Sequence, residues 1–190
     1  DANSLALAQT NLKTAKASID KAVAHEKTKN DPSAWVYKAL IYTDLALLDS
    51  VPTTSTPLLN EATTALKTAV SLDKEGAIKA DIDKVNALMA QYHLNAGVRA
   101  YQAKNFKDAY QAFNNSLTYR PGDTTITYYS GLSAINGQDY PGAIKAYQEL
   151  VKTNFSGNNQ IYLDLSRIYA MQKDTASAIR VAAEGSAKFP

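Results

Sequence analysis

Apolar residues recur at steps of three and four positions along most of the chain. Between residues 12 and 23, for example, Leu12, Ala15, Ile19 and Val23 keep this spacing, which places them on one face of an α-helix. Similar stretches follow one another to the end of the sequence, and several of the few Gly and Pro residues separate them. The pattern therefore predicts a protein built almost entirely of amphipathic helices.

The clearest stretch runs from residue 93 to residue 123. Gly97 and Ala109 are small residues at points where two helices would approach closely, and Phe113 would fill the space between them. Pro121 closes the stretch, because proline cannot continue a helix. The same positions recur 34 residues later as Gly131, Ala143 and Tyr147, and after a one-residue insertion as Ser166, Ala178 and Pro190.

This unit resembles the tetratricopeptide repeat, a helix–turn–helix motif of about 34 residues. The resemblance implies an all-α, right-handed solenoid of about five such repeats, with one long central helix, in a single domain over residues 1–190. The expected repeats are 1–32, 33–74, 90–123, 124–158 and 159–190, with an inserted loop at 49–57 and a linker helix at 75–89.

The N-terminal half departs most from the repeat pattern. We expect residues 3–9 to end one helix and Leu12 to open another. The segment 49–57 has two prolines and a Ser/Thr cluster without periodicity, which predicts a loop. Residues 77–103 read either as one long helix or as two nearly collinear ones, and the sequence leaves both interpretations open.

Composition and charge narrow the class of protein. Apolar residues make up 45% of the chain, which is enough for a continuous core. The net charge is only +2 and the basic residues are scattered, so the clustered cations of a nucleic-acid-binding protein are missing. There is no cysteine, which excludes disulfides and thiol catalysis. No apolar run reaches the roughly 18 residues needed to span a bilayer.

The sequence shows no catalytic constellation. It contains two histidines, no Gly-rich phosphate loop and no nucleophile motif. Glu75, Asp81 and Asp83 lack the loop glycine and terminal Glu of a calcium-binding loop, and a solvated helix face explains them better. We therefore predict a non-enzymatic protein with no cofactor and no metal.

The resemblance also implies where a ligand would bind. Members of this family read peptides mainly on the concave surface lined by the first helix of each repeat, and Tyr, Asn and Gln on that surface suit peptide recognition. An equally open alternative is that these residues merely cover the inner face. The predicted groove residues are Tyr37, Asn95, Val98, Tyr101, Gln102, Tyr128, Tyr129, Leu132, Asn136, Asp164, Arg167 and Met171.

We thus expect a scaffold that binds an unidentified protein or peptide. The alternative is a structural or self-assembly module of the cell envelope, for example a homodimer, that associates through its terminal repeats or its long helix. Several stretches resemble envelope-associated repeat proteins of Bacteroidetes-type bacteria, which implies a periplasmic or envelope location after export. The first residue is Asp1 rather than Met, as expected for a shortened form or one processed by signal cleavage. A cytoplasmic location is the alternative.

Overall fold

The computed structural model describes residues 2–49 and 51–189. This part of the chain forms nine α-helices and no β-strand, so the prediction of an all-α protein is confirmed. The chain divides into two compact units, residues 1–92 and 93–190. Pro190, the proline expected to close the last repeat, lies outside the described residues.

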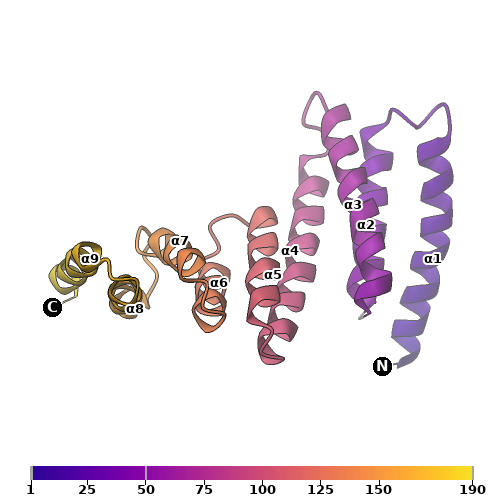
Figure 1. Cartoon of the computed structure of the whole chain (residues 1–190). Coiled ribbons are helices and arrows are strands. Elements are labelled where there is room, and N and C mark those ends of the chain that lie inside the picture. Colours follow the sequence, from indigo (N-terminus) through magenta and orange to yellow (C-terminus); the bar gives the residue numbers. More distant parts are fainter. Residues whose placement is uncertain (1, 50, 190) are drawn as a thin grey trace. The chain divides into compact units, whose positions relative to one another are not determined.

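The first unit contains three complete helices and the start of a fourth. They are α1 (Ala2–Ala24), α2 (Pro32–Leu48), α3 (Pro52–Leu72) and the first part of α4 (Lys79–Gln102). Helix α2 packs against both α1 and α3, as Figure 1 shows at the indigo end of the chain. Its central residues Val36, Ala39 and Ala46 are fully buried, because α2 has neighbours on two sides.

The expectation of two helices within the first 24 residues was wrong. Helix α1 continues from Ala2 to Ala24 without a break. Thr10 and Thr14 do not interrupt it, because each hydroxyl donates a hydrogen bond to the carbonyl oxygen four residues earlier, at 2.9 and 3.1 Å. Because these hydroxyls bond to carbonyl oxygens of the helix itself, they do not favour a non-helical backbone conformation at these positions.

The predicted loop at 49–57 was also largely wrong. Helix α3 already begins at Pro52, which occupies the first helical turn, and it contains Pro57. A proline costs little at the first position, where its missing N–H would have no partner. The hydroxyl of Ser55 donates to the Val51 carbonyl oxygen at 3.0 Å, which supports the first turn. Residue 50 of the predicted loop lies outside the described residues.

The structure decides between the two interpretations of residues 77–103, one long helix or two nearly collinear ones. Helix α4 is a single helix from Lys79 to Gln102, and the boundary between the two units falls within it, after Tyr92. In the first unit, the Tyr92 and Ser55 hydroxyls lie 2.8 Å apart and join α4 to α3.

A single tryptophan fixes the turn between α1 and α2. The indole Nε1–H of Trp35 donates to the carbonyl oxygen of Lys29 at 2.7 Å. Asp31 caps the N-terminus of α2 by accepting a hydrogen bond from the Ser33 N–H at 2.8 Å. These two contacts tie the start of α2 to the preceding turn.

The second unit is a series of shorter helices, each packed on the next. They are the end of α4, α5 (Phe106–Tyr119), α6 (Thr124–Asn136), α7 (Tyr140–Leu150), α8 (Asn158–Met171) and α9 (Thr175–Lys188). Helices α6 and α7 form one close pair and α8 and α9 another, and both pairs are visible in Figure 1. Tyr147, Leu150, Ile161 and Leu165 are buried between these pairs.

Three turns of the second unit share one geometry. Lys104, Gln138 and Lys173 have φ angles of 61°, 60° and 63°, which is the left-handed conformation. The N–H of the residue after each donates to the carbonyl oxygen five positions earlier, and the three bonds measure 2.8, 2.8 and 2.9 Å. The turns are spaced by 34 and then 35 positions, so the same helix–turn–helix unit occurs three times.

The residues after these turns provide a test of helix capping. The Asp139 carboxylate accepts a hydrogen bond from the Gly142 N–H at 3.1 Å, whereas the Asn105 side chain makes no such bond. Because an unpaired N–H at a helix start is costly, Asp139→Ala is expected to lower the free energy of unfolding by about 1 kcal/mol. The matched change Asn105→Ala should have a much smaller effect in urea unfolding, and equal losses would contradict this prediction.

Candidate functional site

A pocket of about 380 Å³ lies between the end of α4 and α6 in the second unit. Val98, Tyr101 and Tyr129 form its walls, and the buried side chains of Phe113 and Ile126 lie beneath. Leu94, Gln102, Asp123 and Thr125 complete the lining. The pocket is therefore apolar inside, with polar groups among its lining, which is the usual character of a binding site.

Gly97 determines where the base of this pocket lies. A Cβ atom at this position would come within 2.7 Å of the Cδ1 and Cε1 atoms of Phe113, so only glycine lets the Phe113 ring lie against α4. The ring is 1% exposed, and its centroid lies 6.0 Å from that of Tyr129. The small residue recognised in the sequence thus sets the position of Phe113, which forms the base of the pocket, on the next helix.

Tyr101 is held from two sides. Its ring meets the rings of Phe106 and Tyr129 edge-on, with centroids 5.5 and 6.4 Å apart. The Asn136 side-chain amide donates to the Tyr101 hydroxyl oxygen at 3.0 Å. The hydroxyl hydrogen of Tyr101 is therefore not used in this contact and can be donated to a ligand acceptor.

Tyr128 takes part mainly in packing. Its ring stacks on Tyr147 with centroids 6.4 Å apart and contacts Phe155 at 5.5 Å. Tyr147 is completely buried, and its hydroxyl has no hydrogen-bond partner within residues 2–49 and 51–189. Burial, with a smaller contribution from the charge of Asp164, raises the pKa of Tyr147 well above its usual value. Both rings thus stabilise the junction between α6, α7 and α8.

The other predicted groove residues are more dispersed. Asp164 on α8 accepts a hydrogen bond from Gln160 at 2.9 Å and lies 3.6 Å from Arg167. Met171 is exposed at the end of α8, Leu132 on α6 is half-buried and Asn95 on α4 is exposed. Tyr37 is half-exposed on α2 in the first unit. The structure therefore gathers Val98, Tyr101, Gln102 and Tyr129 around one pocket, with Asn136 bound to Tyr101.

Sequence reasoning missed two polar residues of this pocket. Asp123 caps α6 by accepting a hydrogen bond from the Ile126 N–H at 3.0 Å, and Thr125 follows within the first turn of α6. The available signal was the Asp immediately before a helical pattern, which is typical of an N-cap. It locates the start of α6 and hence one end of the pocket.

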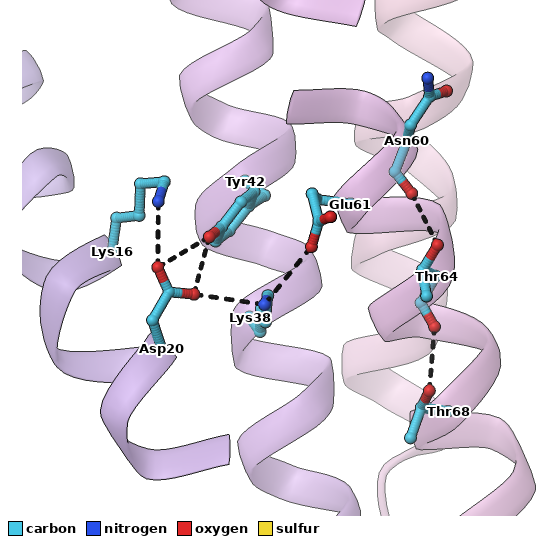
Figure 2. Close-up of polar contacts among 8 residues, drawn as sticks. All are labelled: Lys16, Asp20, Lys38, Tyr42, Asn60, Glu61, Thr64 and Thr68. Carbon is cyan, nitrogen blue, oxygen red and sulfur yellow. Dashed lines mark hydrogen bonds and ion pairs between the residues drawn. The ribbon is translucent and has the colours of Figure 1, made fainter. Parts of the chain in front are cut away.

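A second polar group, which we call the charged cluster, lies in the first unit and comprises Lys16, Asp20, Lys38, Tyr42 and Glu61. The Tyr42 hydroxyl donates to both Asp20 carboxylate oxygens, at 2.7 and 2.8 Å. Lys16 and Lys38 approach the same carboxylate at 3.0 and 3.2 Å. Figure 2 shows Asp20 of α1 facing Tyr42 and Lys38 of α2, with Glu61 of α3 on the far side of Lys38.

The charged cluster is balanced, with two cations facing two carboxylates. Burial would raise the pKa of Asp20, but hydrogen bonds from Tyr42, Lys16 and Lys38 outweigh it, so the pKa is lowered. Burial would likewise lower the pKa of Lys38, but its contact with Asp20 and the neighbouring charges hold it above its usual value. Asp20 and Lys38 are therefore both charged at neutral pH, and the cluster joins three helices.

Residues 128–189 match the sequence model of the Tetratricopeptide repeat family. These residues are tetratricopeptide repeats. The match begins at α6 and includes the turns at Gln138 and Lys173. It confirms the tetratricopeptide-like fold predicted from the sequence. The resemblance to proteins of Bacteroidetes-type bacteria stays a prediction.

The solved structures that are similar to this chain include two of MamA. One is described as "MamA RS-1 ArsTM double mutant", with 16% identity over 95% of this chain and 86% of that one and a TM-score of 0.45. The other, "MamA 41-end from Desulfovibrio magneticus RS-1", has 12% identity over 92% and 93% of the two chains and a TM-score of 0.44. No protein of curated function matches the chain.

The family assignment has a general functional meaning. Tetratricopeptide repeats are scaffolds for protein interactions, since stacked repeats present extended binding surfaces, and typical members are not enzymes. Residues 128–189 therefore form a protein-interaction scaffold. Among the described helices, none is both long and apolar enough to cross a membrane.

Proposed function

We propose that the second unit binds an extended peptide segment of a partner protein, with one large apolar side chain of the peptide in the α4–α6 pocket. The observation that carries this proposal is the exposure of the pocket's wall residues. Val98 and Tyr129 are each 41% exposed although they adjoin an apolar pocket. A peptide side chain would cover them and gain the free energy of apolar burial, about 25 cal/mol per Å².

The polar groups around the pocket suit a peptide backbone. The Tyr101 hydroxyl is already oriented by Asn136, so it loses little freedom when it donates to a peptide carbonyl. Gln102, among the lining residues, offers both a donor and an acceptor. Tyrosine adds contact area at a low cost in conformational entropy. Extended segments expose such backbone groups, whereas a helix uses them internally.

The ligand surface is proposed to continue along the first helices of the repeats. Asp164 and Arg167 of α8 present one acidic and one basic group, only loosely paired at 3.6 Å. The Arg167 side chain is 71% exposed and is therefore available to an acidic residue of the peptide. On the resemblance to envelope proteins we also propose that the protein acts in the cell envelope, and fractionation of the source cell would test this location.

The test is selection from a random peptide library displayed on phage, followed by calorimetry with the enriched peptides. Val98→Arg is expected to weaken binding at least tenfold, or about 1.4 kcal/mol, because it places a charge against an apolar side chain. Ile179→Glu changes an exposed residue on α9 and should leave the affinity unchanged. Enriched peptides that bind wild type and Val98→Arg equally would exclude this pocket.

A further inference from the structure

The site between α4 and α6 has an equivalent between α6 and α8, inside the series of repeats. In that second site Tyr147 and Ile161 belong to a buried core cluster, and other apolar side chains pack against it. The repeat spacing of 34 or 35 positions places Tyr128, Ile135, Tyr147 and Ile161 where the α4–α6 pocket has Leu94, Tyr101, Phe113 and Ile126. The two sites are therefore built from the same positions of consecutive repeats.

The α6–α8 site is occupied by the side chain of Phe155. This residue lies between α7 and α8, outside both helices, and packs against the same core cluster. Its ring centroid is 5.5 Å from that of Tyr128. A Cβ atom at Gly157, the N-cap of α8, would come within 2.7 Å of Cε1 and 3.3 Å of Cζ of Phe155. The chain thus places an aromatic ring from a non-helical segment in this site, with one ring edge against the helix start.

The α4–α6 pocket receives no such ring from its own connecting segment. The connection between α5 and α6 is residues 120–123, which contain no aromatic residue. Tyr119, the last residue of α5, stacks on His93 with ring centroids 5.8 Å apart and does not line the pocket. The segment that corresponds to the one carrying Phe155 is therefore in place and leaves about 380 Å³ open, so the ring has to come from another molecule.

One position differs in chemistry between the two sites. Asp123 lines the α4–α6 pocket and stands 34 positions before Gly157, and each is the N-cap of its helix. One oxygen of Asp123 accepts a hydrogen bond from the Ile126 N–H at 3.0 Å. The other lies 3.9 Å from the Arg120 guanidinium, which is too far for a hydrogen bond. That oxygen is therefore able to accept a hydrogen bond from a ligand.

We propose that the peptide residue in the α4–α6 pocket is a tyrosine whose hydroxyl donates a hydrogen bond to the Asp123 carboxylate. This inference rests on the proposed function and narrows its large apolar side chain to an aromatic ring with a polar edge. A ring placed as Phe155 is placed would turn Cζ, which carries the hydroxyl in tyrosine, toward the N-cap. Because Asp123 has the Cβ that Gly157 lacks, the ring must lie further from the helix start, which leaves room for the hydroxyl. Phenylalanine would cover the carboxylate without offering it a donor.

The probe is a capped synthetic peptide with the sequence of residues 151–157 and the change Phe155→Tyr, compared with the unchanged peptide. Binding to the 190-residue protein is measured by fluorescence anisotropy. The Tyr peptide is expected to bind about tenfold more tightly than the Phe peptide, because its hydrogen bond is made to a charged group. In the protein variant Asp123→Asn, which can still cap α6, the two peptides should bind within about twofold of each other. Asp139→Asn changes another N-cap, that of α7, and should leave the preference for Tyr unchanged.

Three results would overturn this inference: no saturable binding of the Tyr peptide up to about 1 mM, equal binding of the two peptides, or a preference for Tyr that persists in Asp123→Asn. A peptide that displaced Phe155 from the α6–α8 site would give the third result, since that site does not contain Asp123. Asp123→Ser, which also supplies an N-cap, replaces Asp123→Asn if the latter fails to fold.

Two further measurements separate this inference from its alternatives. Sedimentation should show a monomer, and a dimer disrupted by Val98→Arg would assign the pocket to a second copy and overturn the inference. Library peptides that lose affinity for Val98→Arg but carry an aliphatic residue in place of tyrosine would overturn the inference and leave the proposed function standing. Library peptides that bind wild type and Val98→Arg equally would overturn both.

Discussion

Gly131→Ala is expected to destabilise the second unit by about 2–3 kcal/mol, at the upper end of the range for overpacked cores. A Cβ atom at Gly131 would lie 2.5 Å from Cδ1 of Tyr147 and still closer to Cε1. The Tyr147 ring cannot move away, because it is fully buried and stacked on Tyr128. Alanine favours the helix by about 1 kcal/mol relative to glycine, but this gain is smaller than the cost of the clash.

A double-mutant cycle isolates this contact. Tyr147→Leu alone removes the ring and is itself destabilising, because it leaves a cavity. In that background, Gly131→Ala should cost less than about 0.5 kcal/mol or even stabilise, since the helix preference of alanine then remains. Urea unfolding followed by circular dichroism gives all four free energies. A cost of Gly131→Ala that is the same with Tyr147 and with Leu at position 147 would contradict the explanation.

Asp20→Asn is expected to destabilise the first unit by about 1–2 kcal/mol at pH 7. The change removes the carboxylate that binds Lys16, Lys38 and the Tyr42 hydroxyl, while Lys38 has a side chain only 13% exposed. Breaking a fully buried ion pair costs about 3–5 kcal/mol. The smaller figure follows because Asp20 is 33% exposed, so water screens part of the interaction.

The effect of Asp20→Asn should depend on pH in one direction. The folded pKa of Asp20 is lowered, so its contribution is fully present above the unfolded value of about 3.9 and is lost as the pH falls through the lower folded pKa. The difference between wild type and Asp20→Asn should therefore be constant from pH 5 to pH 7 and shrink below about pH 4. A difference that grows below pH 4 would contradict a folded pKa of Asp20 that lies below its unfolded value.

Asp83→Asn is the matched control for the charged cluster. Asp83 pairs with Lys79 at 2.9 Å in the same unit, but both side chains are well exposed. Exposed pairs of this kind contribute about 0–1 kcal/mol. A loss from Asp83→Asn as large as that from Asp20→Asn would mean that burial does not distinguish the two carboxylates.

The repeat spacing in the sequence predicted the second unit well. Gly97 and Gly131 were recognised as points of close helix approach, and they contact Phe113 and Tyr147 as expected. Such contacts are predictable because they occur within one helix–turn–helix unit and depend on local spacing. The first unit was predicted less well. Proline, serine and threonine were read as helix breakers near residue 52, although Pro52 occupies the first turn and the Thr54 and Ser55 hydroxyls bond to the Val51 carbonyl oxygen.

The α4–α6 pocket was predictable only in part. Val98, Tyr101, Gln102 and Tyr129 were named from the repeat register, and all four line the pocket. Tyr128, adjacent to Tyr129 in sequence, packs instead against Tyr147 and Phe155. That difference depends on the position of the following helix pair, which one repeat's pattern does not contain. Whether these residues bind a ligand stays a prediction.

The single tryptophan, Trp35, is an intrinsic fluorescent probe of the first unit. Its indole hydrogen bond to Lys29 holds it at the start of α2, and residues 93–190 contain no other tryptophan. Emission excited at wavelengths that tyrosine does not absorb therefore reports unfolding of residues 1–92 alone, whereas ellipticity sums over both units. A mismatch between the two unfolding curves would reveal independent melting without any label or further substitution.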